Sequence, residues 1–283
     1  MKKYAVISMD VEDWYHTYFA GQAVDRSASM MDGLDIVLDI MKQYHIHGSF
    51  FVVGELVGML EDKLRKMDRE GHDISCHGNI HIRPMSLSEE QFENQLLDGK
   101  RALETALGHN VLGYRAPDFA LDDERQRIVE RCGFRYDSSK LKPQKSSKYG
   151  FMSLPGFCEE KPCIHRRNGF VEFEVSTQPL GSLNMLLGGG YIRMLPWFFM
   201  KYMTQKYINT GKPYVMYIHP IDLSAKAIPK MKKMGFSKYL RTHIGRGRPM
   251  QRRLRKVIEL LQRNGYEFVT FAQLMAISGE TVK

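Results

Sequence analysis

Two histidines four residues apart, His77 and His81, have the residue type and the spacing to bind one metal ion. Imidazole nitrogens are common ligands of divalent metals, and this spacing would bring both side chains to one side of a helical turn. The pattern alone is more often that of two surface histidines, so it needs a partner. Acidic residues at the end of the first predicted strand, Asp10, Glu12 and Asp13, supply one.

The three acidic residues would allow a division of labour in a hydrolytic site. Two histidines and one carboxylate leave coordination positions open for water and substrate, and a second carboxylate can accept a proton from the water. Asp10 and Glu12 would share a face if the strand extends that far. One of the three acidic residues could instead cap the helix that follows.

Strand-like and amphipathic helical segments alternate along the chain, which predicts an α/β fold with a parallel sheet or barrel. Predicted strands cover residues 3–10, 48–53, 73–76, 134–137, 171–175, 214–218 and 267–270, and a short one ends at Arg115. Predicted helices cover residues 29–44, 122–132, 197–207 and 250–263, and one more ends near residue 69. Ser86-Leu-Ser-Glu89 has the capping-box pattern and predicts the start of a helix that reaches residue 107, whereas residues 141–162 are predicted as loop.

Polar side chains gather where the predicted strands end. In parallel α/β folds the carboxyl ends of the strands form the rim at which sites are built. The sequence therefore predicts that these side chains meet at one rim of a single domain spanning residues 1–283. The side chains are those of Asp10, Glu12, Asp13, His77, Arg115, Asp137 and His219.

The composition, with 43% hydrophobic and 26% charged residues, is that of a globular enzyme and argues against a disordered or fibrous chain. The net charge of +9 is concentrated in a basic segment, residues 224–258, which holds twelve Lys or Arg and no Asp or Glu. This segment could face nucleic acid, an anionic lipid surface or a diphosphate-bearing substrate, or it could form a solvated helix face. No nucleic-acid partner is expected, because aromatic residues are not interleaved at a recognisable motif spacing.

The first apolar run is short and broken by charge, unlike a secretory signal, so a cytoplasmic location is expected. In that compartment the four cysteines are expected to be reduced thiols. Cys158 and Cys163 with His165 would leave a structural zinc site one ligand short.

Five segments of the chain resemble the five motifs of the polysaccharide deacetylases with a NodB homology domain, which form carbohydrate esterase family 4. The resemblance covers most of the chain, and the order and spacing of all five segments together make it specific. The segments are Ser8-Met9-Asp10-Val-Glu12-Asp13, His77-Gly-Asn-Ile-His81, Arg115-Ala-Pro117-Asp118-Phe119, Tyr136-Asp137-Ser138-Ser139 and Tyr217-Ile218-His219-Pro220.

The resemblance implies a distorted (β/α)7-type barrel with a C-terminal elaboration, and it implies metal-dependent amide hydrolysis. That reaction needs an activated water, an electrophile on the carbonyl oxygen and a proton for the leaving nitrogen. By this resemblance Asp10 is the general base, His219 is the general acid, and His77 and His81 are metal ligands. On the same basis, Arg115 holds the base in place, and Asp137 orients a catalytic partner.

The first motif departs from the family pattern. The adjacent aspartates of the family are here spread over Asp10-Val-Glu12-Asp13, so the metal-binding carboxylate is either Glu12 or Asp13. The shorter side chain of Asp13 matches the family ligand better. In the second motif, Gly78 stands where the family has Ser or Thr, which removes a hydroxyl but no ligand.

Three further segments, residues 10–14, 172–177 and 188–196, resemble a subgroup encoded with exopolysaccharide and lipopolysaccharide genes. Backbone amides of the three glycines at 188–190 could approach a sugar or a phosphate, with Tyr191 as a stacking platform and Arg193 as an anion clamp. A flexible turn is the alternative. Pro117, in the third motif, is a further candidate for substrate binding.

The expected function is removal of an N-acetyl group from an amino sugar in bacterial surface-polysaccharide biosynthesis, with a divalent metal, zinc being the expected ion. The expected substrate is a precursor sugar linked to a nucleotide or lipid diphosphate, and the basic segment could meet that anion or make peripheral contact with an anionic membrane. Two alternatives stay open: hydrolysis of another small C–N bond, such as a formamide or a cyclic amide, and a catalytically silent carbohydrate-binding relative.

Overall fold

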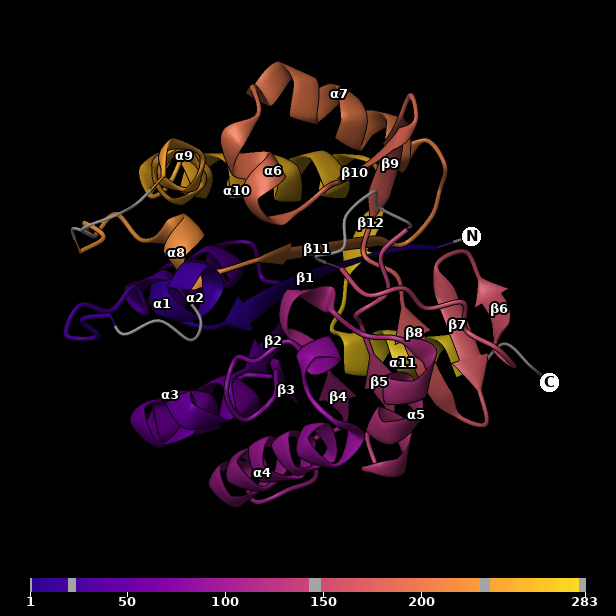
Figure 1. The fold of residues 1–283 in the computed structure, drawn as a ribbon. Coiled ribbons are helices and arrows are strands. Elements are labelled where there is room, and N and C mark those ends of the chain that lie inside the picture. Colours follow the sequence, from indigo (N-terminus) through magenta and orange to yellow (C-terminus); the bar gives the residue numbers. More distant parts are fainter. Residues whose placement is uncertain (1, 20–23, 143–148, 230–234, 280–283) are drawn as a thin grey trace.

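A twisted sheet of ten strands organises the chain, with strands from both halves of the sequence (Figure 1). The structure is a computed structural model that describes residues 2–19, 24–142, 149–229 and 235–279. Seven strands are neighbours in parallel, in the order β11, β1, β2, β3, β4, β5 and β8. Their bounds are β1 Lys3–Val11, β2 Ser49–Val52, β3 Asp73–Cys76, β4 Gly113–Tyr114, β5 Tyr136–Asp137, β8 Phe170–Phe173 and β11 Tyr214–Ile218.

Two kinds of addition extend this parallel array. β12 (Tyr266–Phe268) pairs in parallel with the start of β1. β7 (Ile164–Arg167) and β6 (Cys158–Lys161) continue the sheet beyond β8 in antiparallel orientation. A separate hairpin is formed by β9 (Thr177–Leu180) and β10 (Leu183–Leu186).

Ser176 closes the array into a barrel. Its N–H donates to the carbonyl oxygen of Val215 at 3.0 Å, and the N–H of Val215 donates to the Ser176 hydroxyl at 2.8 Å. These bonds join the chain just after β8 to β11, at the two ends of the parallel array. The expected distorted seven-stranded barrel of mixed α/β class is therefore confirmed.

Helices cover the outside of the barrel. Figure 1 shows α3 and α4 on one side, and α7 and α10 on the side of β11. None of the described helices is long and apolar enough to cross a membrane. The bounds are α1 Trp14–Phe19, α2 Asp32–Gln43, α3 Val57–Arg69, α4 Glu89–Leu107, α5 Asp123–Arg131, α6 Gly189–Met194, α7 Trp197–Ile208, α8 Pro220–Leu223, α9 Phe236–His243, α10 Arg248–Arg263 and α11 Phe271–Gly279.

An aromatic cluster joins the early strands to the last helix. Phe51, Tyr136 and Phe173 pack with Phe271 at the start of α11, with ring centroids 5.0–5.8 Å apart where they meet Phe271. The Phe271 N–H donates to the Ser49 hydroxyl at 2.9 Å. Segments more than 200 residues apart are therefore packed into one core, although the single-domain organisation over 1–283 stays a prediction.

The capping box of α4 lies two residues later than predicted. The Ser88 hydroxyl accepts from the Gln91 N–H at 3.2 Å, and the Gln91 side-chain oxygen accepts from the Ser88 N–H at 3.0 Å. The hydroxyl of Ser86 instead donates to the carbonyl of Arg83. The prediction that residues 141–162 form a loop is wrong at its end, because β6 begins at Cys158. Residues 143–148 of that segment lie outside the described residues.

Candidate active site

The polar side chains expected at the strand ends do meet at one rim. Asp10 is the penultimate residue of β1, and His77, Arg115 and His219 directly follow β3, β4 and β11. Asp137 is the last residue of β5. The short parallel strands thus bring residues that are up to 209 positions apart in the sequence to the same edge.

Glu12, His77 and His81 form a compact set of possible metal ligands. One atom from each lies within 4.8 Å of the other two, and all three side chains are buried. Glu12 Oε2 pairs directly with His81 Nε2 and lies 3.8 Å from His77 Nε2. Two imidazole nitrogens and a carboxylate are a donor set that suits a divalent metal and leaves room for further ligands. These residues fit such a metal.

The two histidines lie in a loop and not on a helical turn as predicted. Gly78, between them, has a φ of +82°, a left-handed backbone conformation that glycine adopts without strain. This accounts for glycine where the family has Ser or Thr. The Nδ1–H of His77 donates to the Arg115 carbonyl at 2.8 Å, so the Nε2 lone pair of His77 is directed toward Glu12.

Burial and neighbouring charges shift the pKa values of the possible metal ligands Glu12 and His77. Burial would raise the pKa of Glu12, but the charges of His81 and His219 outweigh it and hold that pKa well below its usual value. Burial lowers the pKa of His77 to about 4. His77 is therefore neutral near pH 7, which is the form that binds a metal.

The preference for Asp13 as the carboxylate ligand is corrected by its contacts. Asp13 Oδ1 accepts from the backbone N–H groups of Trp14 at 2.8 Å and Met30 at 2.9 Å. Asp13 thereby caps the start of α1 and fixes the segment that leads into α2. The carboxylate that joins the two histidines is that of Glu12.

Arg115 holds the Asp10 carboxylate in one orientation. Its Nη1 atom donates to Asp10 Oδ1 at 2.7 Å and to the Ser8 hydroxyl at 2.8 Å. The guanidinium is fully buried and lies over the ring of Phe51 at 4.1 Å. The second carboxylate oxygen of Asp10 faces His219, with 3.8 Å between Oδ2 and Nε2. Asp10 therefore has one carboxylate oxygen held by Arg115 and the other directed toward His219, and its role as the base stays a prediction.

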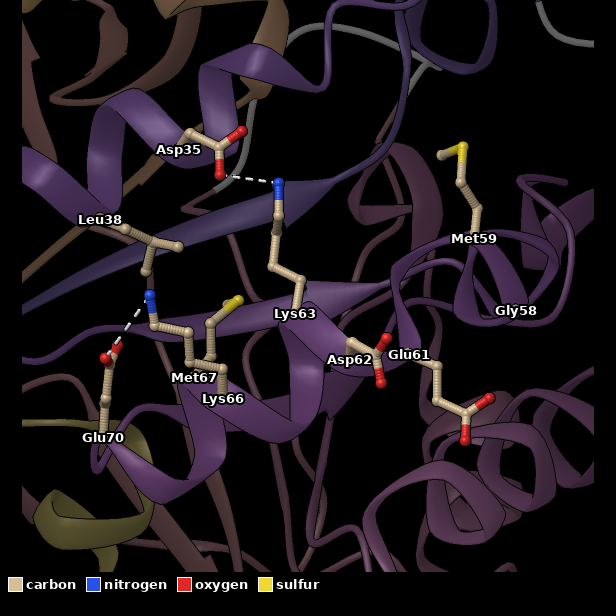
Figure 2. Close-up of a pocket in the computed structure, with 10 residues that line it drawn as sticks. All are labelled: Asp35, Leu38, Gly58, Met59, Glu61, Asp62, Lys63, Lys66, Met67 and Glu70. Carbon is tan, nitrogen blue, oxygen red and sulfur yellow. Dashed lines mark ion pairs between the residues drawn. The ribbon is translucent and has the colours of Figure 1, made fainter.

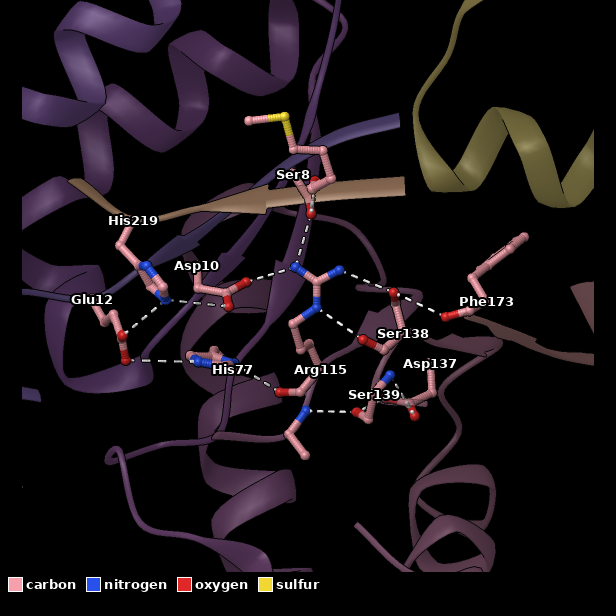
Figure 3. A network of polar contacts seen from close by, with 12 residues as sticks. Ser8, Asp10, Glu12, His77, Arg115, Asp137, Ser138, Ser139, Phe173 and His219 are labelled. Atoms are coloured by element: carbon pink, nitrogen blue, oxygen red, sulfur yellow. Dashed lines mark hydrogen bonds and ion pairs between the residues drawn. The ribbon is translucent and has the colours of Figure 1, made fainter. Parts of the chain in front are cut away.

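The other side of Arg115 is tied to the segment after β5. Its Nε donates to the Ser138 carbonyl and its Nη2 to the Ser138 hydroxyl, each at 2.9 Å. Figure 3 shows Arg115 between two groups, with Asp10, Glu12, His77 and His219 on one side and Asp137 to Ser139 on the other. Arg115 therefore bridges the candidate catalytic side chains and the β5 edge.

Asp137 supports this bridge and is not the partner of His219. The Ser139 hydroxyl donates to Asp137 at 2.7 Å and accepts from the Ala116 N–H at 2.8 Å. Asp137 also pairs with Glu172, its register neighbour on β8. Burial raises the pKa of Asp137, and burial together with the Asp137 charge raises the pKa of Glu172 well above its usual value. Of the two carboxyl groups, Glu172 is therefore the one that more readily holds a proton.

Asp222 is the carboxylate that orients His219, and sequence reasoning missed it. Its Oδ2 lies 3.2 Å from His219 Nδ1 and accepts from the His219 N–H at 3.0 Å. Its Oδ1 lies 2.8 Å from Arg193 Nε, and both side chains of this ion pair are 1% exposed. Although burial favours the neutral imidazole, Asp222 together with Glu12 and Asp10 raises the pKa of His219 to about 9. The only sequence signal was an acidic residue three positions after the histidine at a strand end.

The expected substrate clamp at Arg193 is wrong, because this side chain is buried against Asp222 and donates to the Ile244 carbonyl at 2.6 Å. The glycines before it serve packing: a Cβ on Gly188 or Gly189 would lie 3.0 Å or less from Tyr217. Tyr191 is half-buried against the core, and Pro117, in the third motif, is buried, so stacking and substrate binding at these two residues stay predictions.

Two hollows are lined by residues other than those of the rim. One lies between α2 and α3, where Asp35 pairs with Lys63 at 2.7 Å and Lys66 with Glu70 at 3.9 Å (Figure 2). The other, of about 460 Å³, lies in the basic segment and is lined by residues 224–228, His243 and residues 246–249. Residues 230–234 of that segment lie outside the described residues. All four cysteines are free thiols, as expected.

Comparison with known proteins divides the chain near residue 137. Residues 25–136 match the family described as polysaccharide deacetylase, and residues 138–276 match a domain of unknown function, DUF3473. Among curated proteins, a peptidoglycan-N-acetylglucosamine deacetylase of Bacillus cereus is 29% identical over 99 residues, 35% of this chain and 46% of that protein. A peptidoglycan deacetylase of Helicobacter pylori is 25% identical over 109 residues, 38% of this chain and 37% of that protein.

These alignments cover less than half of each relative's length. Among solved structures, one described as a putative polysaccharide deacetylase from Mycobacterium smegmatis is 18% identical with a TM-score of 0.65, over 99% of this chain and 91% of that one. At that identity the likeness concerns the fold. Taken with the family matches, residues 25–136 resemble the polysaccharide deacetylases, and the DUF3473 region that follows completes the same barrel.

Proposed function

We propose that this protein is a metal-dependent carbohydrate deacetylase that hydrolyses the N-acetyl group of an amino sugar. The observation that carries the proposal is that a candidate base, a candidate acid and a set of possible metal ligands lie next to one another. His219 Nε2 lies 3.8 Å from Asp10 Oδ2 and 3.5 Å from Glu12 Oε1, and Glu12 belongs to the possible metal ligands. The candidate base Asp10, the candidate acid His219 and the possible metal ligand Glu12 therefore lie close enough to act on one acetyl group.

The chain's own residues divide the work of amide hydrolysis. Asp10, held by Arg115, accepts a proton from the attacking water through Oδ2. His219, oriented by Asp222, donates a proton from Nε2 to the leaving nitrogen. A divalent metal held by Glu12, His77 and His81 would polarise the acetyl carbonyl and make the water more acidic. The identity of that metal, with zinc as the expected ion, is part of the proposal.

The proposed substrate is a precursor of a bacterial surface polysaccharide, an amino sugar carrying a nucleotide or lipid diphosphate, used in the cytoplasm. The hollow in the basic segment supports an anionic substrate. Lys226, His243, Arg246 and Arg248 line it, and Lys226 also pairs with Asp32 at 3.5 Å. Its first residue, Ser224, is only five positions after His219, so a diphosphate could lie near the reacting sugar.

Hydrolysis of another small C–N bond is the second candidate, because the same three functions serve a formamide equally well. A catalytically silent carbohydrate-binding protein is a third. The arrangement of Asp10, Glu12, His77, His81 and His219 favours activity over this last reading, since a binding protein has no need for a base and an acid around a metal-binding set.

The test uses the full chain, stripped with a chelator and reloaded with zinc or cobalt. Acetate and formate release are measured with a nucleotide-diphosphate N-acetyl amino sugar, its N-formyl analogue and an N-acetylated oligosaccharide. Metal-dependent acetate release that is lost in Asp10→Asn and His77→Ala supports the proposal. Release of formate alone would favour the second candidate. If the protein binds no metal and releases neither acetate nor formate, only the third candidate, a catalytically silent carbohydrate-binding protein, is left.

A further inference from the structure

Most of the excess positive charge lies in one continuous stretch of the chain. Residues 175–258 contain sixteen Lys and Arg but a single acidic residue, Asp222. That one carboxylate is buried and ion-paired with Arg193. The surface formed by this stretch therefore presents cations without any carboxylate of its own.

Helix α7 lies within this stretch and has an aromatic outer face. Its inner face, formed by Met200, Met203, Thr204, Tyr207 and Ile208, is buried. On the outer face Phe198 is 77% exposed and Tyr202, one helical turn later, is 63% exposed. Lys201 and Lys206 are exposed on the same helix. Two large aromatic side chains side by side in solvent, between lysines, are unusual for a surface with no partner.

The β9–β10 hairpin carries two further exposed apolar side chains next to this helix. β9 packs against α7, and Figure 1 shows the hairpin beside that helix. Leu180 and Leu183 are paired across the hairpin turn, and both are exposed. We call Leu180, Leu183, Phe198 and Tyr202, with Lys201 and Lys206, the α7 surface. Its four apolar side chains are among the eleven large hydrophobic side chains exposed in the described chain, and they fall within 23 consecutive residues.

The α7 surface is held firmly on the barrel. Arg253 of α10 donates to the carbonyls of Ile192, Arg193 and Leu195, just before α7, at 2.6–2.8 Å. Lys256, one turn later on α10, lies over the ring of Trp197 at 5.5 Å. The exposed aromatic side chains therefore stand on a fixed support and add a further cation, Lys256, at their border.

Charge and shape favour an anionic lipid surface over other occupants. A second copy of the chain would bring lysines against lysines, because residues 175–258 offer no exposed carboxylate. A single-stranded nucleic acid needs a groove that follows its backbone, whereas Phe198 and Tyr202 project from the convex face of a helix. Aromatic rings flanked by lysines suit the interface of a bilayer, where rings enter the headgroup region and ammonium groups meet lipid phosphates.

We propose that the α7 surface docks the protein peripherally on an anionic lipid bilayer. Tyr207, near the end of α7, donates to the Pro213 carbonyl just before β11, and Figure 1 shows α7 starting on the side of the barrel where β11 ends. Docking through α7 would thus bring the rim of the barrel close to the membrane. This proposal is independent of the proposed activity.

The test is co-sedimentation of the full chain with vesicles of phosphatidylglycerol and phosphatidylcholine in equal parts, against phosphatidylcholine alone. Trp197 fluorescence is a second readout, because the only other tryptophan, Trp14, is fully buried. The test variant is Phe198→Ala/Tyr202→Ala. The matched control is Met59→Ala/Phe151→Ala, which also removes two side chains at least 60% exposed, outside the basic stretch. Circular dichroism melts verify that both variants fold.

Binding to the anionic vesicles that falls with added salt, a blue shift of Trp197 emission, and a loss of about tenfold or more in binding by the test variant but not the control support the proposal. Equal binding to neutral and anionic vesicles, or wild-type binding by the test variant, overturns it. So does binding to a poly-thymidine oligonucleotide in place of vesicles, which would assign the surface to nucleic acid.

Discussion

Asp222 Oδ2 lies 3.2 Å from Nδ1 of His219, the residue three positions before it, and accepts the backbone N–H of that residue as well. Side chain and backbone of His219 are thus held by one carboxylate. With Nδ1 occupied, the other ring nitrogen must face Asp10 and Glu12. The orientation of the candidate acid is therefore determined within a single turn of chain.

Asp222→Asn should lower the pKa of His219 and slow the reaction. The carboxylate charges outweigh burial and raise that pKa to about 9, so His219 keeps its proton below pH 9 and loses it above. Without the Asp222 charge the proton is lost at lower pH, and the alkaline limb of activity moves down. We expect kcat to fall by about 10²-fold or more at pH 8 with little change in KM. Histidine NMR titration of metal-free protein measures the pKa directly, away from the charge of a bound metal.

Asp137→Asn is the control for this variant. Asp137 lies on the far side of Arg115 from His219, so this change should leave the His219 titration unchanged. If Asp137→Asn moved that titration and Asp222→Asn did not, the assignment of the orienting carboxylate would be wrong.

Glu12→Gln should abolish tight metal binding, whereas Asp13→Asn should preserve it. Glu12 completes the set with His77 and His81, but Asp13 accepts backbone N–H groups through Oδ1, which an asparagine oxygen can also do. We expect affinity for zinc or cobalt to fall about 100-fold or more in the first variant and to change by less than about threefold in the second. Competitive chelator titration gives both values. The reverse order would restore Asp13 as the ligand.

Arg115→Lys should impair catalysis although it conserves the charge. A single ammonium cannot bond Asp10, Ser8 and both acceptors of Ser138 in the plane that the guanidinium uses. We expect kcat to fall by roughly 10–100-fold, because Asp10 loses its fixed orientation. Thermal unfolding is measured alongside. Wild-type kcat in a stably folded variant would show that Asp10 needs no such support.

Glu172→Gln should make the protein more stable at alkaline pH. The folded pKa of Glu172 lies well above its usual value, so its contribution to stability is complete below the unfolded pKa, near 4.5, and is lost as pH rises toward the folded value. Glutamine imitates the protonated form at every pH. We expect a gain of about 1 kcal/mol, or about 2 °C in Tm, at pH 8 and no gain at pH 4.5. Equal effects at both pH values would mean that Glu172 is ionised in the fold.

Much of the barrel could be predicted from sequence, because hydrophobic periodicity marks its strands and long helices. The strands at 3–10, 73–76 and 214–218 were placed within a residue or two. The hairpin β9–β10 and strands β6 and β7 were not predicted, since short edge strands with many polar residues lack that periodicity. Their place in the sheet depends on pairing with residues distant in the sequence.

The sequence predicted most of the residues of the candidate site, but not the contacts between them. Spacing identified the two histidines, and strand ends identified Asp10, Arg115 and His219. Spacing could not separate Glu12 from Asp13, because the choice depends on which carboxylate the amides of Trp14 and Met30 engage. The roles of Asp222 and Arg193 were likewise invisible, as a buried ion pair between α6 and α8 is a product of tertiary packing.

The guanidinium of Arg115 joins Asp10 to Ser138 across residue 137, where the two family matches abut. The border between the recognised family and the domain of unknown function therefore passes through the middle of the candidate site. Neither matched region holds a complete site by itself, because the first contains His77, His81 and Arg115, the second contains His219 and Asp222, and Asp10 and Glu12 precede both. The region of unknown function is thus part of the site, since it places His219 opposite Asp10.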